Sequence, residues 1–225
     1  MKAMLLAAGF GKRMLPLTAH TPKPLLEVGN DSLIGHQLTR LKQAGITEVV
    51  INVAYLGQQI IDKIGEGSDR GLTIHYSIEE EPLETAGGID KALAMLGKEP
   101  FLLVNGDIWT DVDLAQFSRL PLHTNLARLL LVNNPEHNPN GDFSVSESGQ
   151  ILPSKTKQTF TYSGVALIDP KLITRYQHRR EAYPLKEVFD AAIALGKLGA
   201  SIYNGLWLDI GTPERLEALR ELLSN

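Results

Sequence analysis

The 225-residue chain contains no cysteine, which excludes disulfides, cysteine-ligated zinc, iron–sulfur clusters and a thiol nucleophile. It has no uninterrupted run of about 20 apolar residues, so no segment is expected to span a bilayer. Its 22 Lys and Arg against 26 Asp and Glu give a formal charge of −4, unlike the basic excess of a duplex nucleic-acid binder. We therefore expect a cytoplasmic protein without nucleic-acid or membrane partners.

Two kinds of reactive motif are also missing. No serine lies in a Gly-x-Ser-x-Gly elbow, and the six histidines show no His-Glu-x-x-His pair or other close ligand spacing. The sequence therefore supports neither serine-hydrolase chemistry nor a histidine metal site.

The order of apolar patterns predicts an α/β fold. Strands are expected at residues 3–8, 48–53, 72–78, 100–104, 127–132, 143–145, 159–168 and 206–210, and helices at 32–45, 58–64, 87–96, 183–195 and after Thr212. Up to Asp107 strands and helices alternate, which implies parallel strands joined by crossover helices. We predict a single domain, residues 1–225, whose mostly parallel mixed sheet is flanked by helices.

A glycine-rich loop follows the first strand directly, in Ala7-Ala8-Gly9-Phe10-Gly11-Lys12-Arg13. Glycines let the backbone approach a ligand closely, and their amides can point at phosphate oxygens. The loop is not a Walker loop, which needs a glycine, four further residues and then Gly-Lys-Ser/Thr. It is not a dinucleotide fingerprint either, because Met14 stands where the third glycine is needed. By spacing alone, a phosphate site and a tight turn with solvated bases are equally favoured.

Lys23 lies between two prolines in Thr21-Pro22-Lys23-Pro24-Leu25. Flanking prolines fix φ and disfavour a helix, so we expect the lysine on a stiff, extended segment. Such a segment suits a charge that neutralises phosphate, although an exposed loop lysine has the same pattern.

Asp107 and Asp209 each lie at a predicted strand end, where ligands bind in open α/β sheets. If the carboxylates were roughly 4 Å apart, their repulsion would be about 4 kcal/mol at an effective dielectric constant of 20. A cation between them or a protonated carboxyl would relieve it. Two acids plus phosphate oxygens and water suit Mg²⁺, whereas the alternative is two unrelated acids.

An acidic stretch, Glu79-Glu80-Glu81-Pro82-Leu83-Glu84, leads into Thr85-Ala86-Gly87-Gly88 at a predicted helix start. It is either a solvated loop capped by Thr85 or a loop that contacts a base and a sugar.

Together, these segments resemble the sugar-1-phosphate nucleotidyltransferases. The matching segments are Leu6-Ala7-Ala8-Gly9-x-Gly11-x-Arg13-Met14, Pro22-Lys23-Pro24-Leu25, Pro82-Leu83-x-Thr85-Ala86-Gly87, Asn105-Gly106-Asp107, Gly141-Asp142-Phe143 and Trp207-x-Asp209-x-Gly211-Thr212. They cover essentially the whole chain and imply the Rossmann-like fold of that family. The sequence departs from the family pattern at Lys12, often Thr, and at Glu84, commonly Gly. It also lacks a Glu-Lys-Pro element, whose lysine Lys155 or Lys157 could replace.

The resemblance implies attack by a sugar-1-phosphate oxygen on the α-phosphorus of a nucleoside triphosphate, with Mg²⁺ as cofactor. It assigns nucleotide binding to Ala8, Gly9, Gly11, Lys12, Arg13, Lys23 and Thr85. It assigns catalysis to Arg13, Lys23, Asp107 and Asp209, with the two aspartates on the metal. It assigns contacts with the sugar substrate to Gly88, Asn105, Asn140 and Gly141.

Within the family, the short chain and the Glu-Pro-Leu-Glu-Thr stretch are most similar to uridylyltransferases of cell-wall recycling. UTP and a sugar-1-phosphate are then the expected partners. The alternatives are a guanylyltransferase for mannose- or heptose-1-phosphate and a non-catalytic nucleotide-sugar sensor on the same fold.

Overall fold

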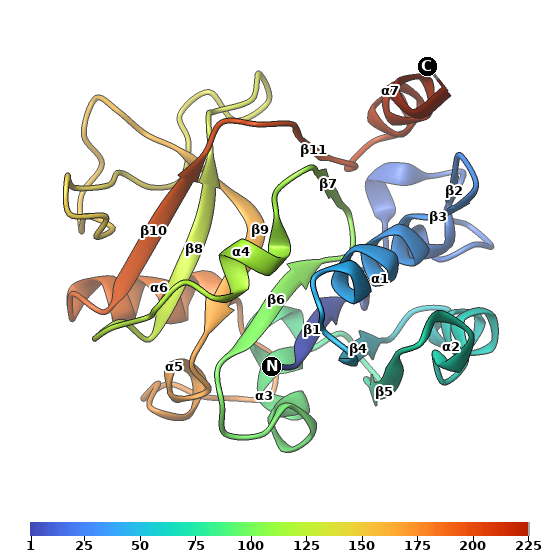
Figure 1. The fold of residues 1–225 in the computed structure, drawn as a ribbon, viewed down its shortest axis with the longest axis horizontal. Coiled ribbons are helices and arrows are strands. Elements are labelled where there is room, and N and C mark those ends of the chain that lie inside the picture. The colour runs from blue at the N-terminus through green and yellow to red at the C-terminus, as the bar shows by residue number, and fades with distance from the viewer. Residues whose placement is uncertain (225) are drawn as a thin grey trace.

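The computed structural model describes residues 1–224, and its longest strands form a seven-stranded sheet of order β10-β8-β9-β6-β1-β4-β5 (Figure 1). The strands are Ala3–Leu6 (β1), Glu48–Val53 (β4), Thr73–Ile78 (β5), Phe101–Asn105 (β6), Ala127–Val132 (β8), Thr161–Ile168 (β9) and Leu198–Tyr203 (β10). Strands β6, β1, β4 and β5 are mutually parallel, and β10 is parallel to β8. Only β9 runs antiparallel to its neighbours β6 and β8. The predicted mostly parallel mixed sheet is confirmed.

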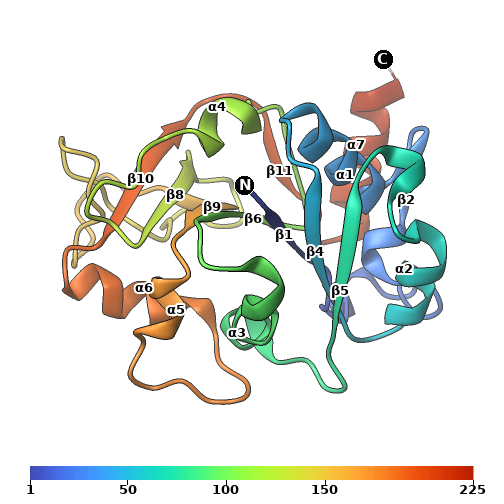
Figure 2. The ribbon, with the colours of Figure 1, turned by 60° about the horizontal axis from the view of Figure 1, so that its bottom comes forward.

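Helices cover both faces of this sheet, with α3, α5 and α6 together on one face and α1 and α4 on the other (Figure 2). The helices are Leu33–Gln43 (α1), Gly57–Ile64 (α2), Glu84–Leu96 (α3), Leu114–Ser118 (α4), Lys171–Thr174 (α5), Leu185–Ala194 (α6) and Pro213–Ser224 (α7). The predicted cap of α1 is confirmed, because Ser32 Oγ accepts a hydrogen bond from Gly35 N at 3.2 Å.

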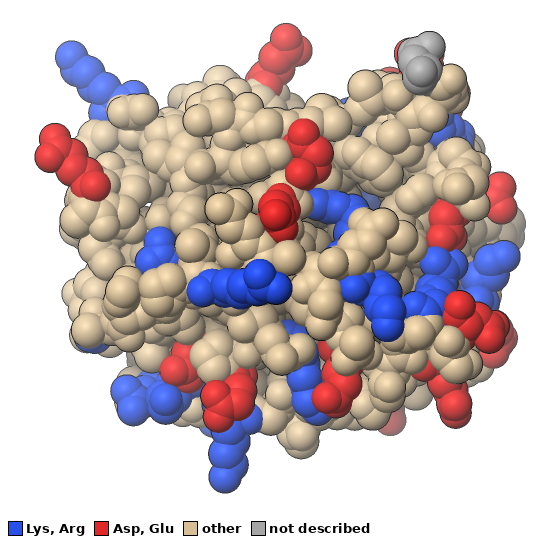
Figure 3. Space-filling view, in the orientation of Figure 1, with Lys and Arg blue, Asp and Glu red and all other residues tan. Residues whose placement is uncertain are grey.

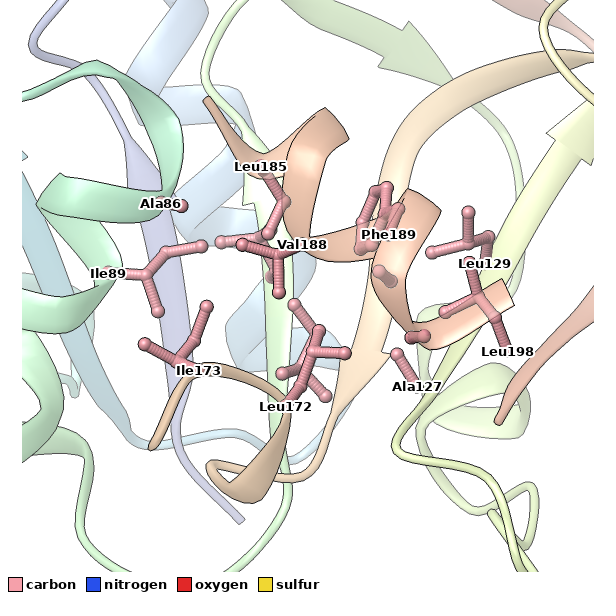
Figure 4. Close-up of a cluster of buried hydrophobic side chains, with 14 of the residues drawn as sticks. Ala86, Ile89, Ala127, Leu129, Leu172, Ile173, Leu185, Val188, Phe189 and Leu198 are labelled. Carbon is pink, nitrogen blue, oxygen red and sulfur yellow. The ribbon is translucent and has the colours of Figure 1, made fainter. Parts of the chain in front are cut away.

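Alternation along the strands divides the core into two layers. Met4 packs with the α3 and α6 side, whereas its neighbour Leu5 packs with α1 on the opposite side, because successive strand side chains point to opposite faces. Figure 4 shows Val188 of α6 directed toward Ile89 of α3 in the first layer. Fully burying such a side chain contributes about 1.5–3 kcal/mol, so this packing holds the helices on the sheet.

Two short ribbons complete the fold beside the main sheet. Ile108–Thr110 (β7) pairs antiparallel with Trp207–Asp209 (β11), and Glu27–Val28 (β2) pairs with Asp31–Ser32 (β3). A third hydrophobic cluster joins α7 to this region through Leu216 and Leu219. The ribbon β7–β11 therefore brings the segments after Asn105 and before Gly211 side by side.

Some sequence predictions differ from the structure. Residues 143–145 form only isolated bridges, to Phe160 and Ile151, and not a strand. Helix α3 begins at Glu84 and not at Gly87. Gly87 and Gly88 lie within the helix at close contacts where a side chain would collide, so these glycines serve packing and do not mark the helix start. The sequence did not predict strand β10, since its residues Leu-Gly-Ala-Ser-Ile-Tyr have little β-branched character and the strand is completed by pairing with β8.

The surface carries charges of both signs. Figure 3 shows Lys and Arg side chains interspersed with Asp and Glu on the face seen in Figure 1. Within residues 1–224, none of the helices has the length and apolar character that crossing a bilayer demands.

Candidate active site

A cavity of about 460 Å³ opens at the carboxyl ends of the parallel strands β6, β1, β4 and β5, where open α/β sheets bind ligands. Nine of the residues predicted for the site line it: Ala8, Gly9, Gly11, Lys12, Arg13, Lys23, Thr85, Asn105 and Asp107. The four others, Gly88, Asn140, Gly141 and Asp209, are not among its lining residues. The fold thus brings together all seven predicted nucleotide contacts but only one, Asn105, of the four predicted sugar contacts.

The glycine-rich loop and the lysine segment pack on each other. Gly11 has φ 62°, and its carbonyl accepts a hydrogen bond from buried Thr18 Oγ1 at 2.9 Å. A Cβ on Gly11 would lie 3.2 Å from Lys23 Cβ, so glycine is favoured here by both conformation and space. Lys12, Arg13 and Lys23 therefore line the cavity from adjoining segments, and a cavity lined by three cationic residues is suited to anionic groups.

Lys23 is held by an ion pair across the cavity. Its Nζ lies 2.7 Å from Asp107 Oδ2, and the lysine side chain is only 11% exposed against 41% for the aspartate. The segment is not extended as predicted, because Lys23 begins a 3₁₀ turn, Lys23–Leu25 (η2). Pro24 fits in this first turn, where its missing N–H leaves no hydrogen bond unmade.

Asp107 is positioned by the turn that follows β6. Gly106 N donates to Leu6 O at 2.9 Å, so this turn lies directly on the end of β1. A Cβ on Gly106 would be 2.6 Å from the same carbonyl oxygen, which is backbone and cannot rotate away. The glycine in Asn105-Gly106-Asp107 therefore permits the close approach that places the carboxylate in the cavity.

Gly106→Ala is expected to lower the free energy of unfolding by about 1–3 kcal/mol, the usual range for overpacking a tight site. Gly9→Ala is the matched control, because a Cβ there meets nothing within 4 Å and enters the open cavity. Urea unfolding of both variants checks this pair. Equal stability of the two would contradict the proposed role of the Gly106 contact.

Asp209 lies beside Asp107 through the β7–β11 ribbon. Ile210 N donates to Asp107 O at 2.7 Å, so the two aspartates belong to adjacent chain segments. The Asp209 carboxylate contacts Arg215 through Oδ2, and its Oδ1 lies 2.9 Å from His137 Nε2. It also borders Gly211, next to which the Arg13 guanidinium lies.

The two aspartates offer the hard oxygen donors that Mg²⁺ prefers. Asp209 Oδ1 is buried and, although His137 is near, receives no hydrogen bond from any residue in the described part of the chain, so it keeps a lone pair for a cation. Residues 1–224 contain no cluster of three or more His, Cys, Asp or Glu arranged to hold a metal. The protein would thus contribute at most two carboxylates, which fits a metal that completes its shell with phosphate oxygens and water.

Three residues predicted to contact the sugar, Gly88, Asn140 and Gly141, lie outside the cavity lining and contact other residues. Lys155 Nζ donates to Gly141 O at 2.5 Å and lies 3.4 Å from Asn140 O, so the lysine considered for the sugar phosphate adjoins both residues. Gly88 instead packs against Asn52 and Glu79, which themselves line the cavity.

Four further polar residues were not singled out individually from sequence: Asn52, Glu79, His137 and Arg215. Asn52 could have been noticed, because it is the one amide in the otherwise apolar stretch Val-Val-Ile-Asn-Val of β4. His137 and Arg215 contact Asp209 from segments 78 residues apart, and no local pattern indicates this.

Comparison with known proteins finds a matching family and similar sequences. Residues 2–225 match the family described as nucleotidyl transferase. The chain is 48% identical over 228 residues to the N-acetylmuramate alpha-1-phosphate uridylyltransferase of Neisseria meningitidis serogroup B, covering 99% of this chain and 98% of that protein. It is 34% identical over 224 residues to the mannose-1-phosphate guanyltransferase beta-A of Xenopus laevis, covering 95% of this chain but 62% of that longer protein.

Solved structures share the fold at lower identity. A putative glucose-1-phosphate thymidylyltransferase of Bacillus anthracis, in complex with a sucrose, aligns with a TM-score of 0.87 at 22% identity, covering 99% of this chain and 94% of that one. HddC of Yersinia pseudotuberculosis, complexed with GMP-PN, aligns with a TM-score of 0.80 at 22% identity over 99% of both chains.

Proposed function

This chain belongs to the nucleotidyl transferase family, and from that premise we propose that it transfers a uridylyl group from UTP to N-acetylmuramate alpha-1-phosphate. The products would be UDP-N-acetylmuramate and pyrophosphate. The observation that carries the proposal is the 48% identity, over nearly the full length of both proteins, to the uridylyltransferase of that name. The reaction fits the recycling of cell-wall sugars, in the cytoplasm where UTP is available.

The reaction needs little covalent chemistry from the protein. A sugar-phosphate oxygen forms a bond to the α-phosphorus of UTP, and the bond from that phosphorus to the oxygen bridging to the β-phosphate breaks. The nucleophile is already ionised at neutral pH, so no general base is required. Catalysis then depends on positioning and on cations placed where negative charge accumulates.

The residues lining the cavity support this division of roles. Amides of Gly9 and Gly11, with Lys12 and Arg13, would bind the triphosphate, and Ala8 and Thr85 would border the base. Lys23, which is held by its ion pair with Asp107, would neutralise charge at the α-phosphate. Asn105, which lines the cavity, and Asn140 and Gly141, which lie outside its lining, would contact ribose or sugar, as expected from the sequence.

Asp107 and Asp209 would hold Mg²⁺, for which their oxygen donors and the buried Oδ1 of Asp209 are suited. When bound, the ion would supply positive charge to the reacting phosphates. Arg215 and His137 contact Asp209 in the structure and would keep its carboxylate oriented.

The first experiment is pyrophosphate release by the purified chain with Mg²⁺, UTP and N-acetylmuramate alpha-1-phosphate. GTP with mannose-1-phosphate runs in parallel, because the 34% identical relative bears that name. Turnover is expected in the UTP reaction only. Turnover confined to the GTP reaction would overturn the proposed choice of base and of sugar. Nucleotide binding without turnover in either reaction would favour the alternative of a non-catalytic nucleotide-sugar sensor.

A further inference from the structure

A buried pair of side chains, Asn52 and Glu79, forms part of the wall of the cavity between the glycine-rich loop and the loop of residues 79–85. Both residues are 3% exposed, yet both are among the residues that line the cavity. Glu79 is a carboxylate in this buried position, and its two hydrogen-bond partners, Asn52 and Leu83 N, are both uncharged. Burying a carboxylate carries a substantial desolvation penalty unless it is hydrogen-bonded, so Glu79 depends on these two hydrogen bonds.

The pair connects two segments that are far apart in sequence. Ala7 N, at the start of the glycine-rich loop, donates to Asn52 Oδ1 at 3.0 Å. Asn52 Nδ2 then donates to Glu79 Oε1 at 2.8 Å, and Leu83 N donates to Glu79 Oε2 at 3.0 Å. The chain of three hydrogen bonds thus runs from the phosphate-side loop to the loop of residues 79–85.

The direction of each hydrogen bond is fixed by chemistry. Ala7 N and Leu83 N are backbone groups that can only donate, so an oxygen must face each of them. Asn52 therefore presents its oxygen to Ala7 and its NH₂ to residue 79, which must accept at both ends. A carboxylate presents an acceptor oxygen at each end, whereas a glutamine at the same position would present an oxygen at one end and an NH₂ group at the other.

Gly88 of α3 provides the space for this pair. A Cβ on Gly88 would lie 2.7 Å from Glu79 Oε1 and 2.9 Å from Asn52 Nδ2. The close approach allowed by this glycine therefore serves the Asn52–Glu79 contact, whereas the sequence analysis assigned it to the sugar substrate.

We propose that Asn52 and Glu79 are positioning residues that set the spacing between the two loops and so determine how tightly the nucleotide binds. The inference rests on the proposed function only in naming that nucleotide UTP. Neither side chain need touch the reacting atoms, and their effect is expected in Kd and KM more than in kcat.

The test exchanges donor and acceptor within the pair. In Glu79→Gln, an NH₂ group must face either the Asn52 NH₂ or Leu83 N–H, so one hydrogen bond is lost. In Asn52→Asp, a second carboxylate would meet Glu79 at the present 2.8 Å contact.

The double variant, Asn52→Asp with Glu79→Gln, reverses the polarity of the contact between the two side chains. The new carboxylate at position 52 accepts from Ala7 N and from the new NH₂ group at position 79. The amide oxygen at position 79 then accepts from Leu83 N. All three hydrogen bonds are restored, and the pair keeps one negative charge.

At pH 8, each single variant is expected to raise the Kd and KM for UTP about tenfold, as expected for an unsatisfied buried group, with kcat within about threefold. The double variant should return both constants to within about threefold of the wild-type values. Glu80→Gln, on the exposed neighbour in the same loop, is the matched control and should leave them unchanged.

A double variant as impaired as Glu79→Gln alone would overturn the proposal, because the carboxylate would then be needed at position 79 itself, in contact with the ligand. Single variants that lower the melting temperature but leave Kd and KM unchanged would also overturn it, since the role would be structural only. Calorimetric measurement of UTP and GTP binding to the wild type distinguishes failure of the positioning role of Asn52 and Glu79 from failure of the proposed function. If GTP binds and UTP does not, the proposed function fails, and the same exchange is measured with GTP.

Discussion

Asp107→Asn is expected to lower kcat by about 10³-fold or more, the upper range for removing a preorganised electrostatic group from an active site. The carboxylate contacts the Lys23 ammonium at 2.7 Å and is one of the two oxygen donors proposed for Mg²⁺. Asparagine keeps the shape but supplies no negative charge to either cation. Steady-state pyrophosphate release with UTP and the sugar phosphate measures the change.

The same substitution should leave the fold intact. The lysine would lose its counter-ion, but the Asp107 side chain is 41% exposed, so solvent limits the loss of stability to about 1 kcal/mol or less. Asp69→Asn, at an exposed position in the 3₁₀ turn Ser68–Arg70 (η3), removes an equal charge away from the cavity and should keep full activity. A folded Asp107→Asn enzyme with near-normal turnover in Mg²⁺ would rule out the role given to this carboxylate.

Lys23→Ala is expected to reduce kcat by about 10²-fold, because its ammonium is fixed by Asp107 and is proposed to neutralise the charge that accumulates on the α-phosphate. The lysine is 11% exposed and tied to Asp107, so it is preorganised and little reorientation is needed during the reaction. Circular dichroism and a melting curve verify folding, and kcat and KM are measured separately for UTP.

Lys12→Ala provides the comparison for this lysine. Lys12 also lines the cavity, but it is exposed and its Nζ lies over the Phe10 ring, 5.2 Å from the centroid. A solvated cation of this kind contributes less than a fixed one, so we expect less than about a tenfold change, mainly in KM. Equal losses of kcat in the two variants would show that charge alone, and not its fixed position, is what matters.

The sequence predicted the architecture because periodicity is a local property. Apolar strands followed by amphipathic segments identified the parallel half of the sheet up to Asp107. Glycines after the first strand and Asn105-Gly106-Asp107 after another also indicated which strand ends face the ligand, since parallel strands end at the same edge. The glycine-rich loop, Asn105 and Asp107 lie together in the cavity for this reason, whereas Lys23 and Thr85 were assigned to the site by the family resemblance.

What the sequence alone determined about this protein is therefore the α/β order of its elements and most of the residues around one cavity. Only the tertiary structure decided how the pieces meet: that Lys23 pairs with Asp107, that His137 and Arg215 contact Asp209, and that Asn52 joins Ala7 to Glu79. It also decided that Gly88 clears space for a buried pair and does not line the cavity. Such contacts depend on strand register and helix packing over tens of residues, whereas a sequence pattern reports only what neighbours along the chain require.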